Sequence, residues 1–355
     1  MPLWTWIVPL VAAFVLAAAM VWPGGALLAV ASAAALVAAV IAAVHHAEVV
    51  AHRIGEPYGT LVLAIAVTVI EVALVLSMML SGGAEAATLP RDTIYAALMI
   101  ICNGVVGICL LVGGLHHREQ SFHIDGVNAA LAALVAMSSL TLVLPNFTTS
   151  APGPTYSPAQ LAFAAVASIT LWAIFVFVQT VRHRDYFLPA GHADDENVHA
   201  EPPGAGLAWA SFGLLVVSLV AVVGLAKVLS PVVEAGVAAM GAPRAVIGIV
   251  IAMLVLLPET WAAVRAARAD RLQTSLNLAL GSAMASIGLT IPVVAAASLV
   301  LGLPLSLGIG GTELVLLATT FIVASITFVS GRTTMMQGAV HLVIFAAFMF
   351  LALMP

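Results

Sequence analysis

Charged residues are scarce in this sequence. Asp, Glu, Lys and Arg together make up 8% of its 355 residues, whereas a typical soluble domain carries about 25%. The net charge of −5 is small, and because it is spread over loops it offers no basic surface to a nucleic acid. Hydrophobic residues account for 63% of the chain. This composition predicts an integral membrane protein that lies in the lipid bilayer.

Cysteine is nearly absent, and the short motifs of two hydrolase classes are missing. Cys102 and Cys109 are the only cysteines, and on one helix they would lie about 10 Å apart along its axis, beyond disulfide reach. No His-Glu-x-x-His and no Gly-x-Ser-x-Gly motif occurs, which disfavours zinc proteases and α/β-hydrolases. Among the possible functions, an intramembrane metal-dependent enzyme is a remote alternative. Such an enzyme would have to use His45, Glu48 and His52 as its metal-binding and catalytic residues.

Long apolar runs divide the chain into membrane-spanning segments. A helix rises ~1.5 Å per residue, so about 20 apolar residues cross the hydrocarbon core of a bilayer. We therefore expect an all-α fold of about eleven transmembrane helices, at residues 3–20, 26–50, 58–80, 93–114, 126–144, 159–181, 206–229, 245–265, 273–301, 312–330 and 333–354. Trp4 and Trp6 favour a retained first helix with an interfacial anchor over a cleaved signal peptide.

One long polar stretch separates six helices from five. Residues 182–204 hold five acidic residues, three histidines and a Pro-Pro pair, a composition typical of a solvated linker. We therefore divide the chain into an extra N-terminal helix at 1–22, a first five-helix unit at 23–181, an acidic, His-containing cytoplasmic linker at 182–204, and a second five-helix unit at 205–355. A sensor of pH or cytosolic cations is the less economical interpretation of the linker.

The distribution of Arg and Lys predicts the orientation in the membrane. Loops after even-numbered helices hold eight arginines, and the opposite side holds three basic residues. Because basic residues favour the cytoplasmic side, we expect a cytoplasmic N-terminus and an external C-terminus. The third helix then runs outward and the eighth inward, so the two five-helix units have opposite topology. The expected fold is one extra helix plus two inverted five-helix repeats.

Each five-helix unit carries one carboxylate near the middle of its second helix. Glu71 lies in the run 58–80, and Glu259 lies in the run 245–265. A charge at this depth costs at least ~2.5 kcal/mol, and two matched copies are harder to explain as protonated acids that merely bond a neighbouring helix. Two ionised carboxylates at low dielectric would repel and titrate as a coupled pair, and protons or a metal cation would relieve the repulsion. The pair predicts a secondary transporter.

The ninth helix offers neutral oxygens near the second carboxylate. At 100° per residue, Ser275, Ser282 and Ser286 fall on one face, with Asn277 beside them. Small and hydroxyl residues permit close helix packing and supply oxygen ligands to cations. Asn103 on the fourth helix is a weaker counterpart. We predict that Ser282, Ser286, Asn277 and Asn103 join the two carboxylates in binding the cation and the protons.

Several strings carry a resemblance to a known family. Among them are AHRIGEPYGTLVLAIAVTVIEVALVLSMML, LLPETWAAVRAARADRLQTSLNLALGSAMASIGLTIPVV and SGRTTMMQGAVHLVIFAAF. Over nearly its whole length the chain resembles the ChaA-type calcium/proton antiporters (sodium-potassium/proton antiporters), a bacterial branch of the calcium/cation antiporter superfamily. The resemblance implies one extra helix plus two inverted five-helix repeats, and a multi-pass protein of the bacterial inner membrane. We expect no resident cofactor, and the oligomeric state stays open.

The resemblance also implies a transport reaction. It implies exchange of cytoplasmic Ca²⁺, or of Na⁺ and K⁺, for external protons, with Glu71 and Glu259 as the paired metal-binding carboxylates. Gly281 and Ser282 match the Gly-Ser step of the second family repeat. The chain departs from the Gly-Asn pair that often precedes the repeat acid, since Leu-Leu-Pro precedes Glu259. Without this pair fewer amide oxygens surround the acids, whereas Ca²⁺ takes 6 to 8 oxygen ligands. A monovalent-only Na⁺(K⁺)/H⁺ antiporter is therefore the alternative.

A polar group at the end of the second helix is a further candidate. His45, Glu48 and His52 are spaced i, i+3 and i+7, which places them on one helical face. They form either an interfacial polar cap or a cytoplasmic access point for protons or a metal. We expect Glu313 to interact with the N-terminal dipole of the tenth helix and His341 to hydrogen-bond within the bundle.

Overall fold

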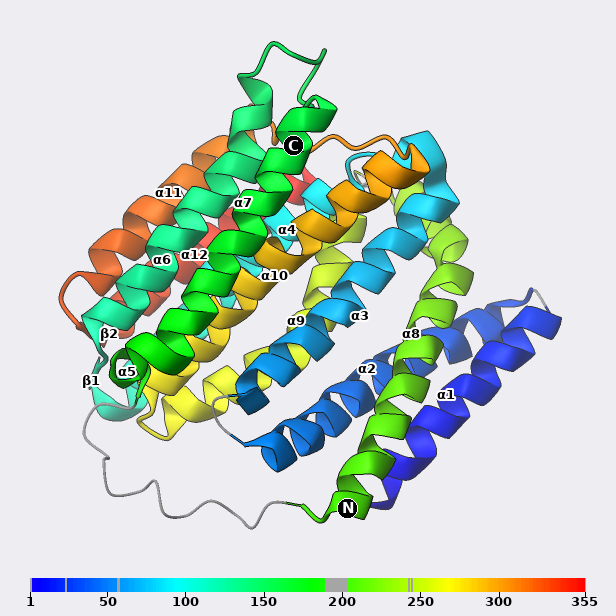
Figure 1. Ribbon diagram of the computed structural model, residues 1–355, viewed down its shortest axis with the longest axis horizontal. Helices are drawn as coiled ribbons and strands as arrows, with labels where there is room; N and C mark the ends of the chain where they lie inside the picture. The colour runs from blue at the N-terminus through cyan, green and yellow to red at the C-terminus, as the bar shows by residue number, and fades with distance from the viewer. Residues whose placement is uncertain are drawn as a thin grey trace.

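The computed structural model describes residues 2–22, 24–55, 58–188, 203–241, 243 and 245–354. Within these residues, eleven helical segments are long and apolar enough to cross a membrane, which confirms the expected all-α membrane fold. The segments form a tilted bundle with the two chain termini at opposite ends (Figure 1). Most of the predicted linker, including His192 and His199, lies outside the described part of the chain.

The transmembrane segments follow one another in the order expected from the hydrophobic runs. The α-helices and strands are α1 (Leu3–Val21), α2 (Ala26–Ile54), α3 (Tyr58–Gly82), α4 (Leu89–Met99), α5 (Val106–His117), β1 (Glu119–Ser121), α6 (Ile124–Ser138), α7 (Pro158–Phe177), α8 (Ala205–Ala239), α9 (Ala245–Arg268), α10 (Leu272–Leu301), α11 (Gly311–Phe328), β2 (Arg332–Thr334) and α12 (Met335–Leu353). Short 3₁₀ turns lie at Gly83–Ala86, Leu144–Asn146 and Arg184–Phe187.

Three of the spans contain a π-helical turn. The fourth span is α4, a π-helical turn at Ile100–Val105 and then α5, while α6 continues into one at Ser139–Val143 and α7 into one at Val178–Arg182. All three turns lie in the first of the two five-helix units. Because a π-helical turn shifts the backbone hydrogen bonds from i→i+4 to i→i+5, it changes the direction in which the following side chains point.

Capping residues fix where two of the helices begin. At the start of α7 the backbone N–H of Ser157 donates to the Gln160 side chain at 3.0 Å. At the start of α12 the backbone N–H of Thr334 donates to the Gln337 side chain at 3.0 Å. In each case the hydroxyl of the first residue also accepts a bond from the first turn. These capping boxes pair backbone groups that a helix end otherwise leaves open.

The extra helix α1 packs against the first helix of each five-helix unit. It contacts both α2 and α8, and Figure 1 shows the three lying together apart from α11 and α12. The His46 ring nitrogen Nε2 of α2 lies 2.8 Å from the Thr5 carbonyl oxygen of α1. Leu16 of α1 occupies the space above Gly224 of α8, where a Cβ would come within 2.4 Å of it.

At one end of the bundle, β1 and β2 pair as a short antiparallel sheet. Beside this sheet the Gln120 amide nitrogen donates to the Ala267 carbonyl at 2.9 Å and to the Asp270 carboxylate at 2.8 Å. The His123 backbone N–H donates to the Gln273 side chain at 2.7 Å. These bonds tie together the loops that follow α5, α9 and α11. We call this end of the molecule the sheet end.

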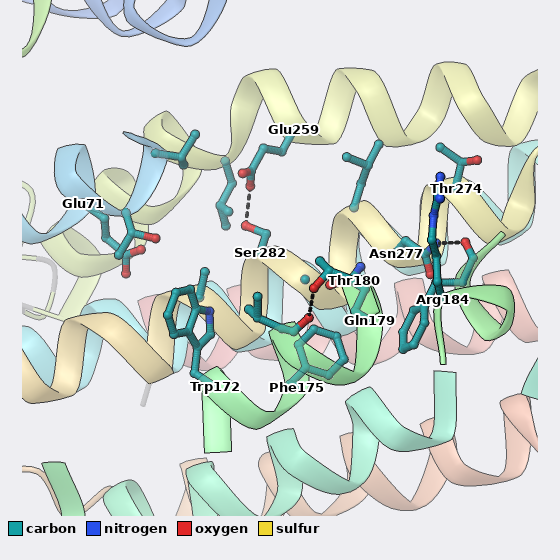
Figure 2. Close-up of a pocket in the computed structure, with 18 of the residues that line it drawn as sticks. Glu71, Trp172, Phe175, Gln179, Thr180, Arg184, Glu259, Thr274, Asn277 and Ser282 are labelled. Carbon is teal, nitrogen blue, oxygen red and sulfur yellow. Dashed lines mark hydrogen bonds between the residues drawn. The ribbon is translucent and has the colours of Figure 1, made fainter. Parts of the chain in front are cut away.

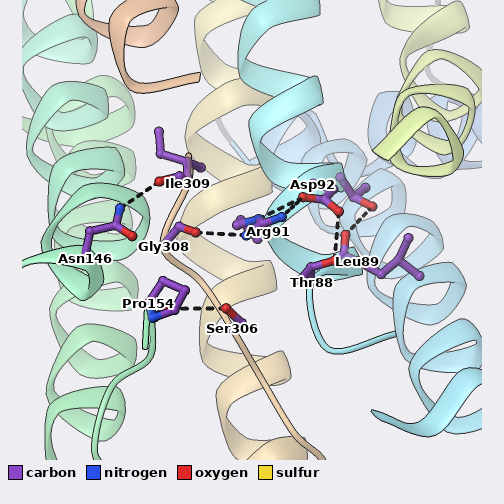
Figure 3. A network of polar contacts seen from close by, with 10 residues as sticks. Thr88, Leu89, Arg91, Asp92, Asn146, Pro154, Ser306, Gly308 and Ile309 are labelled. Atoms are coloured by element: carbon purple, nitrogen blue, oxygen red, sulfur yellow. Dashed lines mark hydrogen bonds and ion pairs between the residues drawn. The ribbon is translucent and has the colours of Figure 1, made fainter. Parts of the chain in front are cut away.

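At the opposite end, an extended segment after α10 crosses between helices. This segment, residues 302–310, is called the connector (Figure 3). The Arg91 guanidinium of α4 donates to the Gly308 carbonyl at 2.9 Å, and the Asn146 amide donates to the Ile309 carbonyl at 2.8 Å. The connector therefore holds the end of α10 against the loops that follow α3 and α6.

Close packing of α5 on α12 gives a first test of this fold. A Cβ at Gly338 would lie 2.3 Å from the Leu111 backbone nitrogen, whereas a Cβ at Gly213, on the lipid-facing side of α8, would meet nothing within 4 Å. Overpacking against backbone costs about 1–3 kcal/mol, so we expect Gly338→Ala to lower the thermal unfolding temperature by several degrees. Gly213→Ala, the control, should leave it unchanged or slightly higher, because alanine is the better helix former. Equal melting of both variants in detergent would contradict the α5–α12 contact.

Candidate functional site

Two helices from different halves of the chain bring Glu71 and Glu259 into one cavity. Glu71 lies in the middle of α3 and is 5% exposed. Glu259 is half-buried and follows Pro258 inside α9. Because proline has no amide hydrogen, Pro258 cannot bond the carbonyl of Leu254, and the helix is loosened beside the acid. Both α3 and α9 pack against α10.

Each carboxylate is paired with a serine of α10. The Ser286 hydroxyl donates to Glu71 Oε1 at 2.5 Å. The Ser282 hydroxyl donates to Glu259 Oε2, a bond that Figure 2 shows. The serines are four residues apart, which places them on successive turns of one helical face. The expected position of Ser282 opposite Glu259 is therefore what the structure shows. That these hydroxyls bind a cation stays a prediction.

A cavity of about 280 Å³ contains both acids in its wall. The polar part of the wall is formed by Thr68, Glu71, Gln179, Thr180, Arg184, Glu259, Thr274, Asn277 and Ser282. A volume of this size holds several water molecules, each of which needs polar partners of this kind. A partly hydrated cation can therefore reach the carboxylates without losing all of its oxygen ligands.

The cavity leads from the carboxylates toward the sheet end. Two residues near this end line the cavity. Thr274 lies in the first turn of α10, and Arg184 begins the 3₁₀ turn Arg184–Phe187. In Figure 2 these two residues are at the far side of the cavity from Glu71. Arg184 is exposed, so its guanidinium stands at the mouth. A fixed positive charge at the mouth repels incoming cations and is screened by salt.

On the other side of the acids, α3 and α10 share a buried apolar contact. Val75 and Met79 of α3 and Val294 of α10 form a buried cluster, with exposed fractions of 0%, 2% and 1%. Val75 and Met79 follow Glu71 by one and two helical turns, and Val294 follows Ser286 by two turns. We call these three residues the apolar plug. The plug separates the acids from the end of the molecule that carries the connector.

Sequence reasoning missed the wall that α7 and the π-helical turn after it contribute. Trp172, Phe175, Gln179 and Thr180 all line the cavity. A Cβ at Gly288 would lie 2.5 Å from the Trp172 Cβ, so the bare glycine lets α7 approach α10 closely. Gln179 and Thr180 were the available signal, because they are polar residues near the end of an otherwise apolar helix.

Asn277 lines the same cavity but is already engaged in hydrogen bonds. Its amide nitrogen donates to the Phe187 carbonyl at 2.6 Å, and its side-chain oxygen accepts from Gln273 at 2.9 Å. These bonds hold the turn after α7 against the start of α10. A direct role of Asn277 in cation binding stays a prediction. Ser275, on the predicted serine face, is fully buried and is not part of the described cavity wall.

Asn103 lies apart from the two carboxylates. It is in the π-helical turn of the fourth span, where its amide nitrogen donates to the Thr320 hydroxyl at 2.9 Å and its oxygen lies 3.2 Å from His341 Nδ1. His341 Nε2 lies 3.1 Å from the Thr327 hydroxyl. The described cavity wall does not include Asn103, so the structure does not bring it to the acids as expected. His341 does hydrogen-bond within the bundle.

The face of His45, Glu48 and His52 does not form a metal site. Among the described residues, no group of three His, Cys, Asp or Glu side chains is placed to hold a metal ion. The His45 ring lies 5.3 Å from the Trp4 ring of α1, centroid to centroid, whereas Glu48 interacts electrostatically with Arg265 of α9. His45 and Glu48 therefore contact different helices, and the use of this face as an entry point for a metal stays a prediction. Its role in proton access stays a prediction.

The sequence profile of the family described as "Sodium/calcium exchanger protein" matches residues 24–181 and 210–354. The chain is 48% identical to the y4hA protein of Sinorhizobium fredii (strain NBRC 101917 / NGR234), over 100% of this chain and 97% of the relative. It is 35% identical to the sodium-potassium/proton antiporter ChaA of Escherichia coli (strain K12), over 86% of this chain and 83% of the relative.

The fold is also similar to solved structures. The crystal structure of the H⁺/Ca²⁺ exchanger CAX superimposes with a TM-score of 0.72 at 12% sequence identity, over 98% of this chain and 87% of that chain. At this identity the match indicates a shared fold and no more. The family profile, in contrast, covers most of both halves of the chain. The chain therefore belongs to the sodium/calcium exchanger protein family of the calcium/cation antiporter superfamily, and it is a membrane cation antiporter and not an enzyme.

Proposed function

We propose that this protein exchanges cytoplasmic cations for external protons at Glu71 and Glu259. The observation that carries the proposal is that two carboxylates, Glu71 buried and Glu259 half-buried, come from different halves of the chain, line one cavity and bond successive serines of α10. Without counter-charges the two ionised groups repel each other and lose hydration. Binding of protons or binding of a metal cation removes both penalties.

Mutual exclusion at the carboxylates gives the coupling. A carboxylate oxygen that holds a proton is a poor cation ligand, so the two cargoes compete for the same atoms. If only the neutralised site passes readily between the two access states, the protein must carry one cargo out and the other back. On charge grounds one Ca²⁺ replaces two protons. A monovalent ion replaces one proton and leaves either one proton or one negative charge behind.

The transported ion is proposed to be Ca²⁺, with Na⁺ and K⁺ also accepted. The names of the relatives support both kinds of cargo, since one is a sodium-potassium/proton antiporter and the solved structure is an H⁺/Ca²⁺ exchanger. Four carboxylate oxygens and two serine hydroxyls make six, the lower limit of the 6 to 8 oxygens that Ca²⁺ prefers, and cavity water supplies any further ligands. The alternative is a monovalent-only Na⁺(K⁺)/H⁺ antiporter, because a site so dependent on water also suits weaker-binding ions.

The proposed orientation puts the sheet end in the cytoplasm of a bacterium and the C-terminus outside its inner membrane. The arginine-rich loops after even-numbered spans lie at this end, as the preference of basic residues for the cytoplasmic side requires. The cavity then opens to the cytoplasm, and the apolar plug faces outward.

We also propose that residues 1–22 are an extra helix and that 23–181 and 205–355 are inverted repeats joined by the linker 182–204; the two family matches support this division.

Neutral replacement of either acid tests the core of the proposal. We expect Glu71→Gln and Glu259→Gln each to reduce ΔpH-coupled exchange in inverted vesicles to background, because an amide keeps the volume but cannot alternate between charge states. Glu119→Gln at the exposed ion pair with Arg332 is the matched control and should exchange normally. Full exchange by either site variant, at wild-type expression, would contradict the proposal.

The choice of ion is measured with purified protein in liposomes. We expect Ca²⁺/H⁺ exchange, with Na⁺ and K⁺ accepted at alkaline pH, where fewer protons occupy the carboxylates. Because protons and cations compete, the apparent KM for the cation should rise as the pH falls and decrease as the pH rises. Exchange of monovalent ions alone, with no competition by Ca²⁺, would favour the alternative function.

Removal of one serine hydroxyl tests whether α10 supplies ligands or scaffold. Ser282→Ala should raise the apparent KM for the cation by about tenfold, because an oxygen bonded to a charged group contributes roughly 1.5 kcal/mol. Ser325→Ala, whose hydroxyl bonds only the Phe321 carbonyl among the described residues, is the matched control. An unchanged KM for Ser282→Ala at several pH values would leave α10 as scaffold.

A further inference from the structure

Helices α3 and α10 face each other along two matching rows of side chains. They run side by side in the same direction (Figure 1). At one level Glu71 of α3 bonds Ser286 of α10, and two turns further on Met79 packs with Val294 in the apolar plug. Residues four apart on a helix share a face, so the position between Ser286 and Val294 on this row of α10 is residue 290.

Residue 290 is a threonine with an unusual environment. Thr290 is 0% exposed, and its hydroxyl has no hydrogen-bond partner within the described part of the chain. Threonines elsewhere in the bundle bond the carbonyl four residues earlier, as Thr141 does to Met137 at 2.8 Å and Thr180 does to Val176 at 2.7 Å. The Thr290 hydroxyl does not form this bond to the carbonyl four residues earlier, that of Ser286.

An unpaired buried hydroxyl in this position calls for a ligand. Valine has the same shape as threonine and would pack here without the desolvation penalty. Buried polar atoms without a partner are rare, and those that persist often meet water or an ion. Along α10 the Thr290 Cα is about 6 Å beyond that of Ser286, in the direction of the apolar plug.

We propose that the Thr290 hydroxyl is a further oxygen ligand for the transported cation, used on the external side of the acid pair when the apolar plug opens. The inference rests on the proposed function and adds a subsite to it. Hard cations such as Ca²⁺ and Na⁺ take neutral hydroxyl oxygens. An ion that leaves Glu71 and Ser286 for the outside meets this oxygen next, before it regains its full hydration. The plug closes the path by excluding water from an apolar constriction.

The test compares cation affinity at the two faces of the membrane. Inverted vesicles expose the cytoplasmic face, and right-side-out vesicles from the same cells expose the external face. The probe is Ca²⁺ or Na⁺, whichever the wild-type protein exchanges better for protons. We expect Thr290→Val to raise the apparent KM at the external face by about five- to tenfold, the usual effect of one lost hydrogen-bonding oxygen, and to change the KM at the cytoplasmic face less than twofold.

Two companion variants separate a ligand from a packing residue. Thr290→Ser keeps the oxygen and loses a methyl group, so its external KM should stay near the wild-type value. Thr141→Val removes a buried hydroxyl that bonds its own helix and should change neither KM. An unchanged external KM in Thr290→Val, an equal rise at both faces, or a Thr290→Ser variant as impaired as Thr290→Val would overturn the inference while leaving the exchange function intact. A wild-type protein that exchanges no cation for protons would overturn the proposed function and this subsite with it.

Discussion

The structure is organised around the free-energy cost of two carboxylates inside a bilayer. A charge at mid-membrane costs at least ~2.5 kcal/mol, and a second like charge beside it adds repulsion. The fold lowers this cost with a serine for each acid and with a cavity that extends from the acids toward the sheet end. In the proposed function, the cost that remains drives the site to take up a proton or a cation. A fully solvated pair would have no such tendency.

Helix α10 is the element on which this arrangement depends. It contacts α3 and α9 and supplies both serines, so a small shift of α10 would change the environment of both acids together. The two ends of the helix are held by different polar contacts. At the sheet end, Gln273 and Asn277 bond His123 and Phe187, and at the other end the connector is fixed by Arg91 and Asn146. A helix anchored at both ends is a stable reference for elements that move around it.

The sequence predicts some of these features better than others, for physical reasons. Hydrophobic length alone gives the number of spans, and the cost of charge in lipid singles out Glu71 and Glu259. Helical periodicity is sufficient to find Ser282 and Ser286, because both lie in an unbroken α-helical part of α10. Asn103 lies in a π-helical turn, where regular spacing fails and the partners come from distant helices. The wall formed by α7 was missed as well, because its polar signal, Gln179 and Thr180, stands only at the end of an otherwise apolar helix.

The π-helical turns have a consequence for the energetics of the whole cycle. Three of them lie in the first five-helix unit, and the described part of the second unit has none. In an inverted-repeat transporter, the two units exchange shapes between the inward-open and the outward-open state. The shape that one unit has in the first state is the shape that the other unit has in the second. Units with different backbones cannot do this at equal free energy, and a difference of ~1.4 kcal/mol already makes one state about ten times more populated. We therefore expect the empty protein to have a preferred resting direction, set by its backbone before any ion binds.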